Sequence, residues 1–141
     1  MLLLGLAAIL ILFTALWAVS LRLQNSSIAD VAWGPGILGI GLIYYFTSDG
    51  VPLRAQLTLA RLAIWAARLG GHLYIRTRLQ GEDFRYVKWR DQYEDSWWWI
   101  SYFKVFLLQA MIAWLVSLPI YFAILSLAPA SLTVLDYAGV A

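Results

Sequence analysis

Residues 57–76, LTLARLAIWAARLGGHLYIR, decide the fold. The stretch is long and apolar enough to cross a membrane as a helix, yet it carries Arg61, Arg68, His72 and Arg76. At 100° per residue these four side chains fall within a wedge of about 80°. A cation at the centre of a bilayer costs roughly 2.5–3.5 kcal/mol even on a lenient insertion scale, so we expect this cationic stripe to face protein, water or an anionic ligand rather than lipid.

The composition of the whole chain is that of a membrane protein. Of its 141 residues 62% are hydrophobic and 13% are charged, whereas a soluble domain has about 25% charged residues. The length fits one compact bundle, so we expect a single domain over residues 1–141. The net charge of +2 is too small and too local to indicate nucleic acid as a partner. The sequence has no cysteine and one histidine, and its carboxylates show no metal-ligand spacing, so no metal site is predicted.

Four apolar stretches predict membrane spans, near residues 2–21, 31–47, 57–76 and 101–127. A cleaved signal peptide is the competing interpretation of the first stretch. No Lys or Arg precedes it and it exceeds the usual apolar length, which favours a retained helix. Pro119 is expected to kink or split the last stretch. The sequence therefore predicts an all-α, polytopic transmembrane helix bundle of about four spans.

A polar segment separates the third and fourth spans. Within it Tyr86, Trp89, Tyr93 and Trp97 recur every three or four residues, while charged residues occupy the other faces. This pattern predicts an amphipathic helix at the membrane surface with its aromatic side chains at the level of the lipid headgroups.

The basic residues predict an orientation. They are concentrated in residues 76–104, whereas the turn at residues 48–56 has Arg54 alone. Because cytoplasmic loops carry an excess of Lys and Arg, we expect segment 76–104 to be cytoplasmic and the N-terminus to be outside. The expected location is the bacterial inner membrane, with membrane lipid as a partner.

The second span begins with polar and small residues. Ser26 or Ser27 is a candidate N-cap, and Asp30 in the first turn would suit the positive end of the helix dipole. Glycines crowd the first half of the span, at positions 34, 36, 39 and 41. Small residues let another helix approach closely, so we expect a helix packing face here.

The cationic stripe continues beyond the third span as Arg78 and Arg85. Guanidinium groups suit bidentate contacts to phosphate, so the pattern predicts a basic wall that binds a dinucleotide phosphate or a lipid headgroup. A structural interpretation is equally open. In that interpretation the outer arginines of the stripe extend to opposite interfaces, and Arg68 pairs with Asp30.

Two residues are candidate proton donors. Asp30 would serve if burial keeps it protonated, and it would equally well be a helix N-terminal carboxylate. His72 is the second candidate, although a lone histidine in a bundle is more often held by its neighbours than catalytic. Residues 81–86, GEDFRY, combine a glycine break with acidic, basic and aromatic side chains. They would either fold over a nucleotide or form a solvated turn.

Three segments together resemble one family of membrane proteins. They are NSSIADVAWG at residues 25–34, GEDFRY at residues 81–86, and WWW at residues 97–99 with FKVFLLQ at residues 103–109. These segments resemble the DUF1295 family, which belongs to the steroid 5-alpha-reductase C-terminal-domain superfamily, alongside sterol reductases and isoprenylcysteine methyltransferases. The resemblance runs over essentially the whole chain. It implies a larger helix bundle and NADPH-dependent reduction of a polarised carbon–carbon double bond in a lipophilic substrate.

The resemblance also implies what this chain can contribute. Family members are commonly about twice as long, and their second half carries an Arg-Tyr-Ser-Arg-His-Pro-Asn-Tyr-like stretch that supplies much of the nucleotide site. We therefore expect this chain to correspond to the N-terminal half of a longer bundle and to be inactive alone, with a missing C-terminal half as a partner. Residues 132–141 look like the start of a further apolar helix.

Three hypotheses follow for the function. The first is an NADPH-dependent reductase in which Asp30 or His72 polarises the substrate oxygen. Its expected cofactor-binding residues are Arg68, Arg76, Arg78, Glu82, Asp83, Arg85 and Tyr86. The second is a lipid methyltransferase that uses S-adenosylmethionine, which the superfamily implies. The third is a small, non-enzymatic or degenerate membrane protein whose arginines pair internally.

Overall fold

The computed structural model describes residues 1–49 and 52–126, and every regular element in these residues is helical. The first four helices are α1 (Leu2–Leu23), α2 (Ile28–Val31), α3 (Trp33–Phe46) and α4 (Pro52–Gln80). A run of six consecutive helical elements follows, made of α5 (Phe84–Tyr93), η1 (Glu94–Ser96), α6 (Trp97–Ser101), the π-helical η2 (Tyr102–Leu107), α7 (Leu108–Val116) and α8 (Leu118–Leu125). The predicted all-α fold class is confirmed. Residues 132–141 lie outside the described residues.

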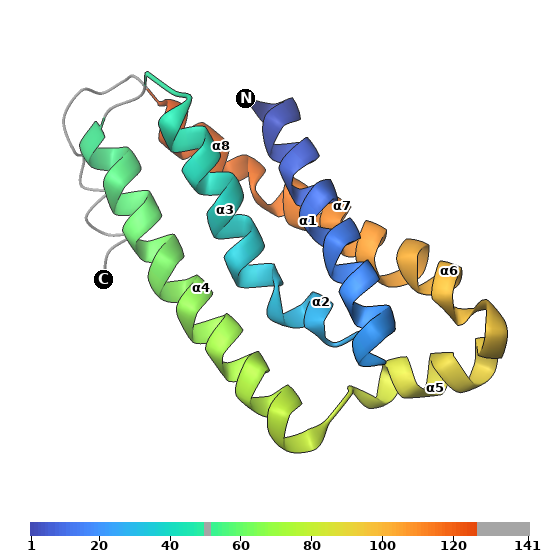
Figure 1. Ribbon diagram of the computed structural model, residues 1–141. Helices are drawn as coiled ribbons and strands as arrows, with labels where there is room; N and C mark the ends of the chain where they lie inside the picture. The colour runs from blue at the N-terminus through green and yellow to red at the C-terminus, as the bar shows by residue number, and fades with distance from the viewer. Residues whose placement is uncertain (50–51, 127–141) are drawn as a thin grey trace.

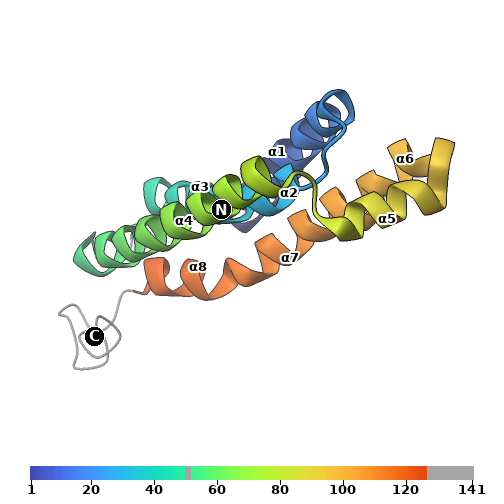
Figure 2. The same cartoon turned by 90° about the horizontal axis from the view of Figure 1, so that it is seen from below.

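The helices form two layers, seen face-on in Figure 1 and from below in Figure 2. One layer holds α1, α3 and α4 side by side, and the stretch from α5 to α8 runs along the other. Two indole N–H groups connect the layers: Trp17 donates to the carbonyl of Trp98 over 2.8 Å, and Trp114 donates to the carbonyl of Leu2 over 3.2 Å. These hydrogen bonds satisfy half-buried donors that would otherwise cost free energy in an apolar bundle.

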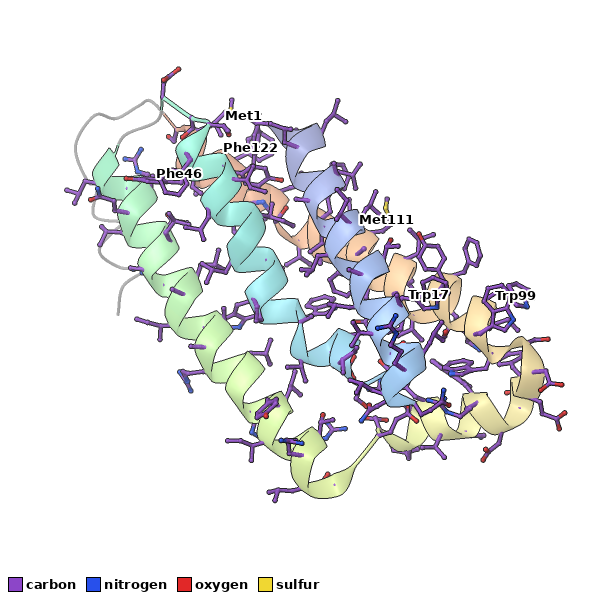
Figure 3. The ribbon with its side chains drawn as sticks, in the orientation of Figure 1. Met1, Trp17, Phe46, Trp99, Met111 and Phe122 are labelled. Atoms are coloured by element: carbon purple, nitrogen blue, oxygen red, sulfur yellow. The ribbon has the colours of Figure 1, made fainter. Side chains whose placement is uncertain are left out.

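Two helical stretches of the described residues are long and apolar enough to cross a membrane, Leu2–Leu23 and Phe84–Leu125. Large apolar side chains point outward from the bundle, as Phe46, Trp99 and Phe122 do in Figure 3. Such side chains are suited to contact acyl chains, and the chain is an all-α membrane bundle. The helix α3 has only 14 residues, and α4 carries many charges, so the count of four spans stays a prediction.

The second predicted span is divided rather than continuous. The short α2 ends at Val31 and α3 begins at Trp33, with Ala32 between them. Ser27 is the N-cap residue of α2, but its side chain makes no cap hydrogen bond. Its hydroxyl instead accepts a hydrogen bond from the backbone N–H of Asp83, 2.8 Å away. Ser27 and Asp30 thus occupy the predicted N-cap and first-turn positions, but the Ser27 hydroxyl serves a contact with a distant turn and not the helix end.

The glycine-rich face of α3 packs against α4, as the small residues predict. A Cβ atom on Gly34 would lie 2.9 Å from both Cα and the carbonyl oxygen of Ala66. No side chain fits at that distance, so Gly34 sets how closely the two helices approach. Gly39 has nothing within 4 Å and takes no part in this contact.

The last apolar stretch is split at Ser117, and Pro119 lies in the first turn of α8. Proline is tolerated there because its missing N–H would have no helical partner in any case. The hydroxyl of Ser117 donates to the carbonyl of Trp114 over 2.6 Å and lies 3.2 Å from the hydroxyl of the buried Tyr44. The break predicted from Pro119 is confirmed.

The aromatic side chains of the polar segment turn toward the bundle, and the placement of their helix at the membrane surface stays a prediction. Tyr86 and Trp97 are buried, and Trp89 and Tyr93 pack against the core. The Tyr93 and Trp97 rings are stacked, and the Lys104 ammonium lies 4.3 Å from the centre of the Trp89 ring. The spacing of these residues identifies the apolar face of α5, and in the structure this face packs on the bundle. An inward face and a lipid-facing one have the same period, so the sequence did not distinguish them.

Candidate functional site

The turn between α4 and α5 places Glu82 and Asp83 next to the residues that follow α1. Gly81, with a φ of 79°, ends α4 in the left-handed conformation that glycine adopts without strain. Asp83 then caps α5, because its carboxylate accepts a hydrogen bond from the backbone N–H of Arg85 over 3.0 Å. Residues 81–86 are thus not a fully solvated turn. They form a folded connection.

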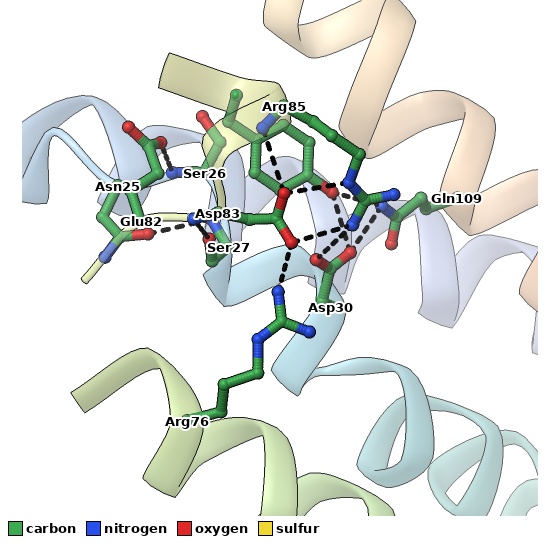
Figure 4. A network of polar contacts seen from close by, with 10 residues as sticks. Asn25, Ser26, Ser27, Asp30, Arg76, Glu82, Asp83, Arg85 and Gln109 are labelled. Carbon is green, nitrogen blue, oxygen red and sulfur yellow. Dashed lines mark hydrogen bonds and ion pairs between the residues drawn. The ribbon is translucent and has the colours of Figure 1, made fainter. Parts of the chain in front are cut away.

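Asp83 is the centre of this connection (Figure 4). Its side chain is only 3% exposed and forms ion pairs with Arg76 and with Arg85, the latter at 2.9 Å. These charged hydrogen bonds favour the ionised carboxylate. The contact with Arg85 does most to lower the pKa of Asp83 from the usual 3.8 to about 2, and burial opposes it.

Asp30 lies beside this centre, at the end of α2. Its carboxylate accepts hydrogen bonds from the Tyr86 hydroxyl over 2.8 Å and from the Gln109 amide over 3.0 Å, and it lies 3.5 Å from Arg85. The Gln109 amide nitrogen is also 3.1 Å from the Tyr86 oxygen. Asp30 is therefore surrounded by donors, as Figure 4 shows. In this arrangement it acts as a hydrogen-bond acceptor.

Glu82 belongs to a separate contact. It accepts a hydrogen bond from the backbone N–H of Ser26, and it pairs with Arg90 over 2.8 Å. Arg90 also donates to the side-chain oxygen of Gln24 at the end of α1. Glu82 therefore fixes α5 to the loop after α1, and it lines none of the cavities described below.

A cavity of about 370 Å³ opens beside Asp30. One wall is polar and consists of Asp30, Arg76, Arg85 and Gln109. The other wall is apolar and consists of Trp33, Leu69 and Leu73. Its volume falls within the range of about 300–1,000 Å³ that small-molecule pockets occupy. The Oε1 atom of Gln109 is buried without a hydrogen-bond partner among the described residues, so the polar wall has a spare acceptor.

The remaining members of the cationic stripe lie in a different hollow, a groove of about 730 Å³ along α4. Arg61, Arg68 and His72 line it together with Ile64, Trp65 and Leu69, and no acidic residue does. The Nη2 atom of Arg61 is buried without a hydrogen-bond partner among the described residues. Leu69 lines both this groove and the cavity beside Asp30.

The predicted site residues are therefore distributed over several places. Five of them meet in one cluster: Asp30, Arg76, Asp83, Arg85 and Tyr86. His72 and Arg68 lie in the groove along α4 and share no cavity with Asp30. Arg78 lines a third hollow, described below. The alternative pairing of Arg68 with Asp30 is not formed, because Arg85 pairs with Asp30 instead.

Sequence reasoning missed Gln109 as a site residue. It is a single amide within an apolar helical run, and a polar side chain in such a position needs a partner. That isolation was the available signal. Ser27 and Arg90 were missed too, and their partners lie 56 and 8 residues away along the chain, beyond any local pattern.

A comparison with protein families finds one match. The model of the family described as "Protein of unknown function (DUF1295)" covers residues 16–141. The chain belongs to the DUF1295 family. Comparisons with curated proteins and with solved structures gave no match. The matched range of this DUF1295 protein contains all the residues that form the cluster around Asp30 and Asp83.

Proposed function

We propose that this DUF1295 protein is part of a membrane-embedded reductase that uses NADPH to reduce a polarised carbon–carbon double bond in a lipophilic substrate. One observation carries the proposal. A cavity with one polar and one apolar wall adjoins a groove lined by cations without acids, and Leu69 lines both. A lipophilic substrate in the cavity and an anionic cofactor in the groove would thereby come close to each other at Leu69 of α4. The rest of the nucleotide site would come from a C-terminal half of the kind that the family resemblance implies.

The cavity beside Asp30 suits a lipophilic substrate that carries one oxygen. Trp33, Leu69 and Leu73 would contact its hydrocarbon body, and the polar wall would face its oxygen. Arg85 lines this wall and is held in place by Asp83 and Asp30. A guanidinium in that position would stabilise negative charge that develops on the substrate oxygen during reduction.

Tyr86 and Asp30 would provide the proton. Asp30 lines the cavity, and the buried Tyr86 hydroxyl donates to its Oδ1 atom from behind the wall. NADPH, when bound, supplies a hydride to the carbon beta to the polarising group. The proton for the neighbouring carbon then comes from water by way of this pair, which balances the reduction. Asp30 would take up this proton from water and pass it to the substrate, Tyr86 would hold the Asp30 carboxylate in place, and His72 has no role in this step.

The residues of the groove fit the phosphates of such a cofactor. Arg61 and Arg68 face no carboxylate there, and one N–H group of Arg61 has no partner among the described residues. Arg76 and Arg85, by contrast, are paired with Asp83, and Arg85 also lies beside Asp30, so two carboxylates balance the two cations. Arg61 and Arg68 would therefore hold the phosphates, because an unpaired guanidinium keeps its full charge and its hydrogen-bonding edges for the ligand.

The proposed location is the bacterial inner membrane, with the cluster on the cytoplasmic side and the N-terminus outside. This orientation gives a soluble cofactor access from the cytoplasm. It can be tested directly, because the sequence has no cysteine and Lys88 is exposed on α5. A Lys88→Cys variant is expected to react with a membrane-impermeant maleimide in inverted vesicles and not in intact cells.

The cofactor proposal is tested by titrating NADPH into lipid nanodiscs that hold the chain together with a C-terminal half of the kind that the family resemblance implies and by following nicotinamide fluorescence. Wild type is expected to bind, and Arg68→Ala is expected to weaken binding by about tenfold, the effect of one charged hydrogen bond. Lys88→Ala, which removes an exposed cation from α5, is the matched control and should leave the Kd unchanged. An absence of NADPH binding, or equal losses in both variants, would contradict the proposal. Binding of S-adenosylmethionine instead would point to a methyltransferase.

A non-enzymatic role is the second candidate, and one observation favours it. The cluster around Asp83 pairs its cations internally, which is what a purely structural set of arginines would do. This role requires that the groove along α4 be covered by another protein segment rather than by a cofactor. A chain that binds neither NADPH nor S-adenosylmethionine but co-purifies with a stoichiometric partner would support it.

A further inference from the structure

A third hollow, separate from the cavity and the groove, lies between the ends of α1 and α4. Its volume is about 590 Å³. Figure 1 shows α2 between the C-terminal ends of these two helices, and α2 forms its floor through Ile28 and Val31. We call it the α1–α4 crevice.

The two ends of the crevice differ in chemistry. Leu16, Ile28, Val31 and Pro35 supply apolar surface along its length. Asn25, Thr77 and Arg78 supply polar groups where α1 and α4 end. A ligand that matches both parts has an apolar chain and an anionic or hydrogen-bonding head.

Arg78 has the free charge that such a head requires. Its guanidinium lies over the Tyr74 ring, 5.7 Å from the ring centre, and it has no carboxylate partner in the part of the chain that the structure describes. A ring that contacts the face of the guanidinium leaves its N–H edges for an acceptor. Arg78 was predicted to bind a cofactor, yet it lines neither the cavity beside Asp30 nor the groove along α4.

We infer that the α1–α4 crevice binds one anionic phospholipid, with its phosphate on Arg78 and an acyl chain along α2. Charge complementarity selects an anionic head, and the apolar length of the crevice selects a lipid over a free phosphate. The polar groups of Asn25, Thr77 and Arg78 lie at the ends of α1 and α4, and lipid headgroups contact membrane proteins near the ends of their helices. The bound lipid would fill the space between α1 and α4 beside α2, which carries Asp30.

The inference is tested by native mass spectrometry of the whole chain released from micelles that contain phosphatidylglycerol or phosphatidylcholine. Wild type is expected to retain one phosphatidylglycerol in preference to phosphatidylcholine. Arg78→Ala should weaken this retention by about tenfold, and Arg78→Lys should keep most of it. Arg22→Ala is the matched control, because Arg22 is an exposed cation at the end of α1 that does not line the crevice.

A second variant tests the apolar part without changing charge. Thr77→Phe places a ring in the crevice and should reduce phosphatidylglycerol retention although Arg78 remains. Circular dichroism and elution volume check that each variant is folded. The inference is overturned if Arg78→Ala and Arg22→Ala behave alike, or if phosphatidylcholine is retained as well as phosphatidylglycerol. It is also overturned if inorganic phosphate displaces the lipid, since the acyl chain would then contribute nothing.

Discussion

The cluster around Asp83 and the groove along α4 use the same residue type in opposite ways. In the cluster, Arg76 and Arg85 form ion pairs with carboxylates, so their positive charge is balanced within the protein. In the groove, Arg61 and Arg68 have no acid beside them. The role of an arginine in this bundle, structural or ligand-binding, therefore depends on its partners and not on its position along the sequence. Paired arginines stabilise the fold even where, like Arg85, they line a cavity, whereas unpaired arginines keep their full charge for a ligand.

The largest effect that separates the two regions is expected from Asp83→Asn. This change removes the charge that pairs with two arginines while asparagine can still cap α5, and the expected loss is about 3 kcal/mol of unfolding free energy. This loss is at the low end of the range for breaking a buried ion pair because both arginines are partly exposed to solvent. Titration with denaturant in detergent micelles measures it. Asp91→Asn, an exposed carboxylate on the same helix, is the control, and equal stability of the two variants would mean that the cluster is not structural.

The pH dependence of stability is expected to come from the same carboxylate. The pKa of Asp83 is about 2 in the folded protein and 3.8 ordinarily, so the unfolded chain takes up a proton first as the pH falls. Asp83 thus stabilises the fold fully above about pH 4, and this contribution, about 2 kcal/mol, is lost as the pH falls toward 2. The measurement is the difference in stability between wild type and Asp83→Asn at a series of pH values. A difference that does not shrink over this range would show that the charge of Asp83 contributes little.

The sequence predicted the fold more completely than the site, and the reason is physical. Apolar period and length define helices locally, so the fold class and the break near Pro119 follow from the residues themselves. The 80° stripe on α4 was also correctly placed on one face in its central part, since Arg61, Arg68 and His72 share a groove. Arg76 leaves that set because its side chain turns to Asp83, which lies across a helix end.

What could not be predicted is which cation meets which carboxylate. Asp30 has Arg85 as its partner and not Arg68, and this depends on how the turn at Gly81 returns α5 toward α2. Apolar residues on the inward face of α5 have the same spacing as residues on a membrane-facing side. The spacing alone therefore could not predict that Tyr86 is buried. Such pairings are set by tertiary geometry, which a period of 3.6 residues does not encode.

A smaller effect is expected when one arginine of each region is removed. Arg76→Ala takes one of the two cations from Asp83 and should cost about 1 kcal/mol of stability, whereas Arg68→Ala should change stability by less than about 0.5 kcal/mol. The order reverses for a ligand, because Arg68 and not Arg76 is proposed to hold phosphate. Measuring both stability and NADPH affinity for each variant gives a crossed comparison. If both variants change both quantities alike, the division between paired and unpaired arginines is wrong.

The smallest effect is expected from Gln109→Leu, and its size reports on the cavity wall. The substitution removes the amide donor that contacts Asp30 and Tyr86, but it also removes the carbonyl oxygen that is buried without a partner. These effects oppose each other, and Asp30 keeps Tyr86 and Arg85, so we expect a loss of only about 0.5 kcal/mol in the unfolding free energy. Gln109→Glu is the informative companion, because it places a second carboxylate beside Asp30 and should destabilise the fold more at neutral pH than in mild acid. A large loss from Gln109→Leu would mean that the spare acceptor is satisfied in the folded protein, by a water or a ligand that the cavity holds.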